Sequence, residues 1–228
     1  MFGIALAALV CGWGLGLDPF RLFAGNTLKL AGEFFAAAPT PALDYEKPVD
    51  GAEPFLLTVL TATLRTLRFA LLAMTVAVPC GAVLALGATT SWWPDLRRHP
   101  WLGVALRALY LVARSWIAFA RSIHELIWGL LFITAMGVST DAAVIAVAIP
   151  YSGILAKIYS EMLEEHSRES RDALRAIGAG SFSAFVFGLV PRALPDLVSY
   201  TFYRLECGLR TAAVFGFVGI ETIGYRIK

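Results

Sequence analysis

The stretch DALRAIGAGSFSAFVFGLVPRALP, residues 172–195, decides how the rest of the chain is interpreted. Its first residues are charged, glycines follow at Gly178 and Gly180, and the remainder is apolar until Pro191 and Pro195. Neither proline can continue a helix from the preceding turn without a break, because proline lacks the backbone N–H and its ring clashes with that turn. The segment therefore predicts a short helix and then a restart of the chain at the prolines.

The predicted short helix runs from Asp172 to Phe187. Glu169 and Asp172 lie near its start, where the helix dipole favours carboxylates, and Gly178 supplies a weak point or a turn. The simplest interpretation is an interfacial amphipathic helix that connects two membrane spans and has no other role.

The composition is that of a membrane protein. Hydrophobic residues make up 58% of the 228 residues and charged residues 16%, against about 45–50% and about 25% in a typical soluble domain. The mean hydropathy is +0.69. A net charge of +2 with scattered basic residues argues against nucleic acid as a partner. The cysteines and histidines are unclustered, which predicts small core cysteines and no metal site: Cys11, Cys80, Cys207, His99, His124 and His166.

Five charge-poor windows approach the length of about 20 residues that a bilayer span requires. They are Phe2–Leu17, Pro54–Gly87, Leu109–Met136, Thr140–Tyr159 and Asp196–Thr222. Residues 18–53 between the first two windows are polar and predict an exposed loop, and Gly137–Ser139 predict a turn. We expect the first window to be a membrane span that is kept in the mature protein and whose true start lies before residue 1. We also expect a further span after Lys228.

Two loops set the predicted orientation. SWWPDLRRHPW, residues 91–101, combines three tryptophans with Arg97 and Arg98, which suits a cytoplasmic interfacial loop under the positive-inside rule. Residues 157–192 are also rich in basic residues, and counting the crossings places them on the same side. The short helix is therefore predicted on the cytoplasmic face.

The spacing of this segment resembles the EAA loop of ABC-importer permeases. The matching positions are Asp172, Ala173, Leu174, Gly178, Gly188, Val190 and Pro191. Asp replaces the usual Glu, Leu the second Ala, and Gly188 the usual aliphatic residue. The resemblance implies a coupling helix at about residues 169–187 that docks on a separate ATPase. The coupling residues that it implies are Glu169, Asp172, Ala173, Leu174, Gly178, Ala179 and Pro191.

Two further stretches are similar to permeases for phosphonates. RSIHELIWGLLFITAMG, residues 121–137, resembles their RSIPE(L/F)(I/V)WALLF, and SYTFYRLECGLRTAAVFGFVG, residues 199–219, resembles their SYTLYRFEINVRAATVLGFVG. The likeness covers most of residues 55–228. It implies an all-α, polytopic transmembrane helical bundle with the type I ABC importer permease fold. Residues 1–53 are then an N-terminal transmembrane span with an extracytoplasmic segment, and residues 54–228 form the permease core.

This chain departs from the family pattern at two places. His124 replaces a proline, which removes a kink from the predicted third span. Residues 220–222 (Ile-Glu-Thr) replace a small Ala-Gly-Gly run, which predicts a stiffer hinge. The predicted gate or hinge residues are Gly216, Gly219 and Gly224.

Charges inside the predicted spans are the candidates for a substrate path, because ionisable groups at membrane depth are costly. Glu206 and Arg210 are one helical turn apart and predict an ion pair, as do Arg121 and Glu125. Arg204 lies about 200° round the helix from Glu206 and needs another partner or an anion. Two interpretations stay open: the five charges form a packing network between spans, or the arginines line the path of an oxyanion.

The resemblance implies a transmembrane permease subunit that moves phosphonate-like oxyanions into the cell by alternating access. The resemblance also implies that this chain is not an enzyme and binds no cofactor, with ATP and Mg on the partner ATPase. The absence of a GxxxxGK[ST] motif agrees with a nucleotide site on another subunit. The implied partners are two ATP-binding subunits, a second permease copy or a paralogue, an extracytoplasmic phosphonate-binding protein and the lipid bilayer. The implied location is the bacterial cytoplasmic (inner) membrane, as a multi-pass protein.

Alternative functions remain at this stage. Phosphite, a phosphate ester or a methionine-type solute could replace phosphonate as the cargo. An ion-gradient-driven secondary transporter would show two related halves, and we find no internal repeat. A membrane-embedded enzyme would need a cluster of catalytic residues that the sequence does not show.

Overall fold

The computed structural model describes residues 2–14, 16, 25–39, 54–94 and 100–226. Several predicted features fall partly or wholly outside these ranges, namely the end of the window Phe2–Leu17, much of the polar segment 18–53, the basic pair Arg97–Arg98 and His99. The chain divides into two units, Met1–Leu56 and Leu57–Lys228.

The described part of the first unit includes α1 (Phe2–Gly14) and α2 (Gly25–Ala37). Helix α1 has 13 residues, which rise about 20 Å, and lies within the predicted window Phe2–Leu17, whose role as a transmembrane span stays a prediction. The predicted loop 18–53 includes a helix, α2, which carries an exposed i,i+4 pair between Lys29 and Glu33.

The second unit is a bundle of helices, and the structure assigns no strand in its described residues. Among the described residues, four helical segments are long and apolar enough to cross a membrane: Phe55–Gly87, Trp101–Ser122, Thr140–Glu165 and Ser181–Tyr225. The first three segments correspond to α3 (Phe55–Gly87), α4 (Pro100–Ser122) and α6 (Thr140–Glu165). The fourth is a run of successive elements: α8 (Ser181–Ala184), η2 (Phe185–Leu189), α9 (Val190–Phe215), η3 (Gly216–Val218) and α10 (Ile223–Arg226). The predicted all-α polytopic bundle is confirmed.

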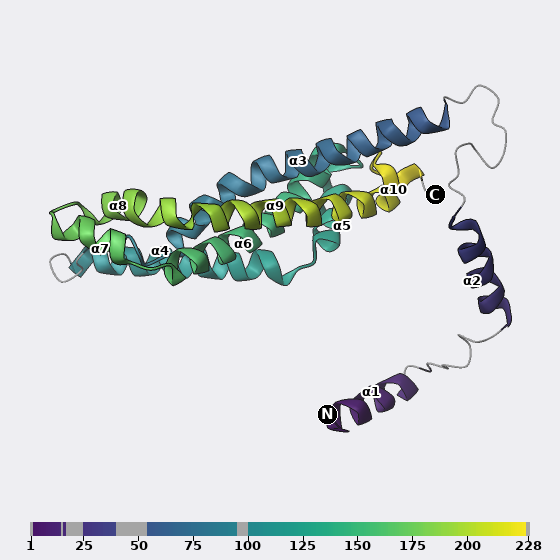
Figure 1. Cartoon of the computed structure of the whole chain (residues 1–228), viewed down its shortest axis with the longest axis horizontal. Helices are drawn as coiled ribbons and strands as arrows, with labels where there is room; N and C mark the ends of the chain where they lie inside the picture. Colours follow the sequence, from purple (N-terminus) through teal and green to yellow (C-terminus); the bar gives the residue numbers. More distant parts are fainter. Residues whose placement is uncertain (1, 15, 17–24, 40–53, 95–99, 227–228) are drawn as a thin grey trace. The chain divides into compact units, whose positions relative to one another are not determined.

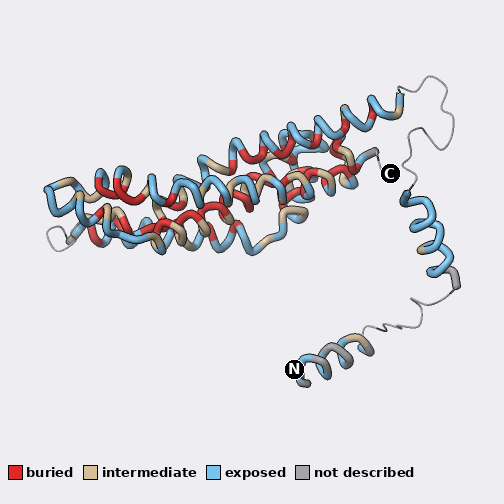
Figure 2. The backbone as a smooth tube through the Cα atoms, in the orientation of Figure 1, coloured by how far each residue is buried: buried red, intermediate tan, exposed pale blue. Residues whose placement is uncertain are grey.

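Helix α6 is the centre of the bundle. In its most apolar window 72% of residues are buried, against 39% or less in the other three candidate spans. Buried residues follow the facing sides of α3, α6 and α9, and the outer faces are exposed (Figure 2). In the core the rings of Phe69 on α3 and Phe215 on α9 lie 5.8 Å apart. The exposed faces carry many large apolar residues, as expected of surfaces that meet lipid.

The predicted third span, Leu109–Met136, is two helices. Helix α4 ends at Ser122, and α5 (Glu125–Met136) begins after His124. His124 takes an extended conformation, and its Nδ1 accepts the N–H of Leu126 at 3.3 Å. The expectation that His124 removes a kink was therefore wrong, because the imidazole caps a new helix at this position.

The predicted single helix Asp172–Phe187 is also two helices. Helix α7 (Glu169–Ala176) ends at a turn through Gly178, whose φ is +97°, and α8 begins at Ser181. The prolines do not break the chain as predicted. A π-helical turn, η2, precedes α9, and Pro191 lies in the first turn of α9.

The predicted fifth span, Asp196–Thr222, was wrong at both ends. Helix α9 runs from Val190 to Phe215, and the chain then tightens into η3 and turns back into α10. The N–H of Ile223 donates to Thr66 Oγ1 on α3 at 2.9 Å, which fixes the turn to the bundle. Helices α7 and α8 lie at one end of the bundle and α10 at the other (Figure 1).

Candidate functional site

The short helix α7 is held to the bundle by one buried arginine. Arg171 is 9% exposed although most of its neighbours on α7 are exposed. Its Nη1 donates to the carbonyl of Ser91 at 3.1 Å, and its Nε and Nη2 donate to Asp172 Oδ1 at 2.9 and 2.7 Å. Charge-assisted bonds of this kind are among the stronger ones in proteins, so α7 is fixed to the α3–α4 connection.

The turn after α7 has a defined geometry. The N–H of Ala179 donates to the carbonyl of Leu174 at 3.0 Å, and the N–H of Gly178 to that of Arg175 at 3.1 Å. This pair of bonds is the Schellman motif, which requires a left-handed residue after the last helical one. Gly178 fills that position, where a side chain would add about 1 kcal/mol of strain or more.

Gly188 allows α7 to lie directly on η2. A Cβ atom at this position would lie 2.9 Å from Arg171 Cα and 3.0 Å from Arg171 N. Both are backbone atoms that cannot move unless α7 moves. Gly188 stands where the EAA pattern has an aliphatic residue. It therefore makes the close contact through which α7 packs on η2.

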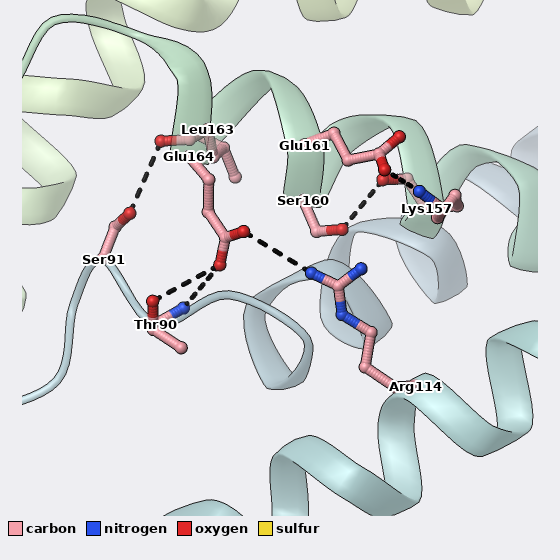
Figure 3. Close-up of polar contacts among 8 residues, drawn as sticks. All are labelled: Thr90, Ser91, Arg114, Lys157, Ser160, Glu161, Leu163 and Glu164. Atoms are coloured by element: carbon pink, nitrogen blue, oxygen red, sulfur yellow. Dashed lines mark hydrogen bonds and ion pairs between the residues drawn. The ribbon is translucent and has the colours of Figure 1, made fainter.

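The end of α6 joins the same anchor. Glu164 accepts bonds from the N–H and the hydroxyl of Thr90 at 3.1 and 3.4 Å, and Arg114 Nη2 on α4 lies 3.5 Å from its other oxygen (Figure 3). Ser91 Oγ lies 3.5 Å from the carbonyl of Leu163. The α3–α4 connection, to which Arg171 donates, is therefore also hydrogen-bonded to α6, and through Glu164 it is linked to α4.

The predicted coupling residues form one exposed surface around α7 with one exception. Most of them are exposed or half-buried on α7 and its turn: Glu169, Asp172, Ala173, Leu174, Gly178 and Ala179. Pro191 is exposed but belongs to α9. Ile177 was not predicted, and its side chain, 82% exposed, is the most exposed apolar group of this surface.

The predicted path charges do not form one network. Arg210 bonds to Glu206 as predicted, and both side chains are exposed on α9, at 73% and 60%. The Arg121–Glu125 pair was wrong, because the helix breaks between the two residues, and Glu125 Oε1 instead accepts the Thr211 hydroxyl at 3.1 Å.

Arg204 and Glu125 are joined through a buried tyrosine. The Arg204 guanidinium lies over the Tyr151 ring with its Cζ 4.0 Å from the ring centroid. The Tyr151 hydroxyl lies 2.9 Å from Thr211 Oγ1, which leads on to Glu125. The buried Nε of Arg204 has no hydrogen-bond partner in the described part of the chain. The guanidinium therefore has a cation–π partner and an unused donor.

The predicted hinge glycines occupy a tight corner. A Cβ at Gly216 would overlap the backbone N of Tyr225, and one at Gly224 would overlap the carbonyl oxygen of Ala213. Gly219 has a φ of +106° and ends η3. These three glycines let α10 pack against α9, and their role as hinges stays a prediction.

Sequence reasoning missed the residues that connect these sites. They are Arg114, Tyr151, Glu164, Arg171 and Thr211. Arg114 and Glu164 are charges in or beside spans, which was a usable signal. Tyr151 and Thr211 gave no such signal, since single polar residues in a span are common and their contact joins α6 to α9 across 60 positions of sequence.

The fold and these contacts are those of a helical membrane bundle with a short helix anchored at one end. Residues 55–228 match the family of binding-protein-dependent transport system inner membrane components, and the chain belongs to that family. It is a multi-pass membrane protein.

Relatives within this family carry names of phosphorus oxyanion transport. The chain is 30% identical over 222 residues to the phosphate-import permease protein PhnE of Mycolicibacterium smegmatis, covering 97% of this chain and 37% of that protein. It is 28% identical over 162 residues to the phosphite transport system permease protein PtxC of Stutzerimonas stutzeri, covering 71% and 55%. The chain thus spans between about a third and about half of the length of these relatives.

A solved structure supports the fold. The MetNI methionine ABC transporter in inward-facing conformations matches with a TM-score of 0.61 at 22% identity, covering 77% of this chain and 82% of that one. The expected type I ABC importer permease fold is confirmed.

Proposed function

We propose that this chain is the transmembrane permease subunit of an ATP-driven importer for phosphonate-like oxyanions. The observation that carries the proposal is the seating of α7: Arg171 bonds its first turn to Ser91, and Gly188 lets its backbone touch η2. A short helix fixed this firmly at one end of a bundle can transmit a push or pull to the spans, whereas a simple linker needs no such anchor.

The proposed partners are two ATP-binding subunits, a second permease copy or paralogue and an extracytoplasmic binding protein, in a bacterial inner membrane. ATP and Mg are bound by the partner ATPase. Its closure would draw the α7 helices together and open the bundle outward, and hydrolysis would reverse the motion. Ile177 projects from the docking surface and would enter an apolar site on the ATPase.

The proposed cargo is a small tetrahedral phosphorus oxyanion of the phosphonate class. The names of the relatives support the phosphorus oxyanion, and the YRLE run of α9, which ends at Glu206, supports phosphonate among this group. Guanidinium groups match such oxygens in geometry and charge.

The first test is ATP dependence. We expect the full-length protein, purified from its own host membrane, to retain an ATPase subunit. We expect vesicles that contain the complex to take up methylphosphonate only when ATP is present on the side of the membrane where the ATPase lies. Uptake driven by an ion gradient without ATP would contradict the proposal and favour a secondary transporter.

Arg204 tests the path. Arg204→Gln removes the charge that faces Tyr151 and leaves the exposed Glu206–Arg210 pair intact. We expect methylphosphonate uptake to fall about tenfold or more, since a charge-assisted bond to an oxyanion is worth at least about 1.4 kcal/mol. Arg210→Gln is the matched control and keeps near wild-type uptake. Wild-type uptake by Arg204→Gln in an assembled complex would remove Arg204 from the path.

A further inference from the structure

A basic pocket lies at the end of the bundle opposite α7. It has a volume of about 290 Å³, and α3, α6 and the turn before α10 line it. Its polar lining residues are Arg65, Arg68, Thr140, Glu221 and Thr222. We call this site the outer arginine pocket, and none of the path residues predicted from the sequence belongs to it.

One arginine of the pocket is occupied by an internal carboxylate. Arg65 Nη1 donates to Glu221 Oε2, and both side chains are more than half exposed. A carboxylate on a guanidinium presents two oxygens, as a phosphonate would.

The second arginine has no such partner. Arg68 is exposed one helical turn after Arg65, on the same side of α3, and no ion pair joins it to the residues that the structure describes. With Glu221 the pocket carries two positive charges and one negative charge. An anion placed between the guanidinium groups therefore relieves their repulsion.

A buried hydroxyl adds a neutral donor. Thr222 lines the pocket and is 2% exposed, and its Oγ1 has no hydrogen-bond partner within the described ranges. Buried polar groups without a partner cost free energy, and an oxyanion would satisfy this one. Thr140, at the first turn of α6, brings the positive end of that helix to the same pocket.

The depth of the pocket suits an entrance. Residues 69–87 of α3 carry no charge and rise about 28 Å, close to the thickness of the hydrocarbon core, so Arg68 lies where that core ends. The α7 end is at the far side of this stretch (Figure 1). With α7 on the cytoplasmic face, the outer arginine pocket faces the extracytoplasmic side.

We propose that the outer arginine pocket binds a phosphorus oxyanion as it enters the bundle, and that Glu221 occupies Arg65 until the oxyanion displaces it. In this proposal Arg65, Arg68 and Thr222 all donate hydrogen bonds to the bound anion. The Glu221 carboxylate weakens binding by competition, which lets a permease release its cargo. This inference rests on the proposed function for its choice of ligand.

The test measures methylphosphonate binding by ³¹P NMR titration of the purified full-length protein in membranes of a phosphorus-free glycolipid. Arg68→Gln removes the unoccupied guanidinium, and we expect binding to weaken about tenfold. Glu221→Gln frees Arg65, and we expect binding to strengthen several-fold, about fivefold or more. Arg107→Gln, the same change at an exposed position on α4, leaves binding unchanged.

Arg68→Gln and Glu221→Gln are expected to change methylphosphonate binding in opposite directions, and this distinguishes a binding site from a structural ion pair. If Glu221 only fixed the turn before α10, its replacement would weaken binding or leave it unchanged, and either result overturns the proposal. Equal binding by Arg68→Gln and Arg107→Gln overturns it as well. Arg68 has no partner in the described part of the chain, so its replacement decides the question even where Glu221→Gln lowers thermal stability.

A second arm distinguishes a free oxyanion from a lipid headgroup. The titration is repeated in phosphatidylglycerol, whose phosphate diester carries related chemistry. Retained methylphosphonate binding in both lipids supports the proposal. If Arg68→Gln changes only the amount of phosphatidylglycerol that co-purifies, the pocket is a headgroup site and the proposal fails. Since the titration needs no ATPase, a failed pocket with intact ATP-driven uptake leaves the proposed function standing, and the reverse result leaves the pocket standing.

Discussion

Gly188→Val is expected to abolish ATP-driven uptake while the spans remain folded in the membrane. The new Cβ would lie 2.9 Å from Arg171 Cα, 3.0 Å from Arg171 N and 3.1 Å from Leu174 Cδ1. Overpacking of this kind costs about 1–3 kcal/mol, and every 1.4 kcal/mol lowers the seated fraction of α7 about tenfold. The measurements are uptake of methylphosphonate and ATPase activity in reconstituted vesicles. We expect uptake to fall and the remaining ATP hydrolysis to be uncoupled from transport.

The matched control is Gly180→Ala, eight residues earlier, where an added Cβ meets nothing within 4 Å and φ is −61°. It should transport like the unaltered protein. Normal coupled uptake by Gly188→Val would show that the contact between α7 and η2 has no part in transport. An unfolded bundle would instead appear as loss of the protein from the membrane fraction, and Gly188→Ala, with less added volume, then carries the test.

Gly224→Ala is expected to detach α10 from the bundle. Its methyl group would overlap the carbonyl oxygen of Ala213, so α9 and α10 cannot keep their present contact. The bond from Ile223 N to Thr66 Oγ1 at 2.9 Å would be lost with it. We expect a loss of about 2–3 kcal/mol or more, seen as a lower thermal midpoint in detergent and as faster hydrogen exchange over residues 216–226.

Gly208→Ala is the control within α9, because its new Cβ would meet Tyr151 Cε2 at 3.4 Å, an ordinary contact. If hydrogen exchange over residues 216–226 is unchanged in Gly224→Ala, the close packing of α10 against α9 at this glycine is contradicted. A large fall in uptake at unchanged stability would instead favour the gate role predicted for these glycines.

Helix α6 links the three polar sites of the bundle. Glu164 joins the α7 anchor near its last turn, Tyr151 carries Arg204 at its middle, and Thr140 lines the outer arginine pocket at its first turn. It is also the most buried of the candidate spans. A buried helix that contacts all three sites is a candidate for the element through which movement at α7 would reach the other end.

The sequence alone determined the class of the molecule. Apolar windows of span length predicted a helical membrane bundle because lipid forces every backbone group to bond within its own segment. The spacing from Asp172 to Pro191 predicted a coupling segment, whose role stays a prediction, and Gly178 marked its turn because only glycine takes a positive φ at little cost. The pairing of Glu206 with Arg210 followed from one helical turn of separation.

The tertiary structure alone decided where helices break and which side chains meet. His124 ends a predicted span because its ring caps α5, and Gly188 seats α7 because a backbone distant in sequence lies against it. Arg65 contacts Glu221 across 156 positions, which makes a pocket from two segments that lie far apart in the sequence. Local patterns report the environment that a lipid bilayer imposes on every span, whereas these contacts depend on how the spans pack against one another, and the order of residues along the chain does not contain that packing in a readable form.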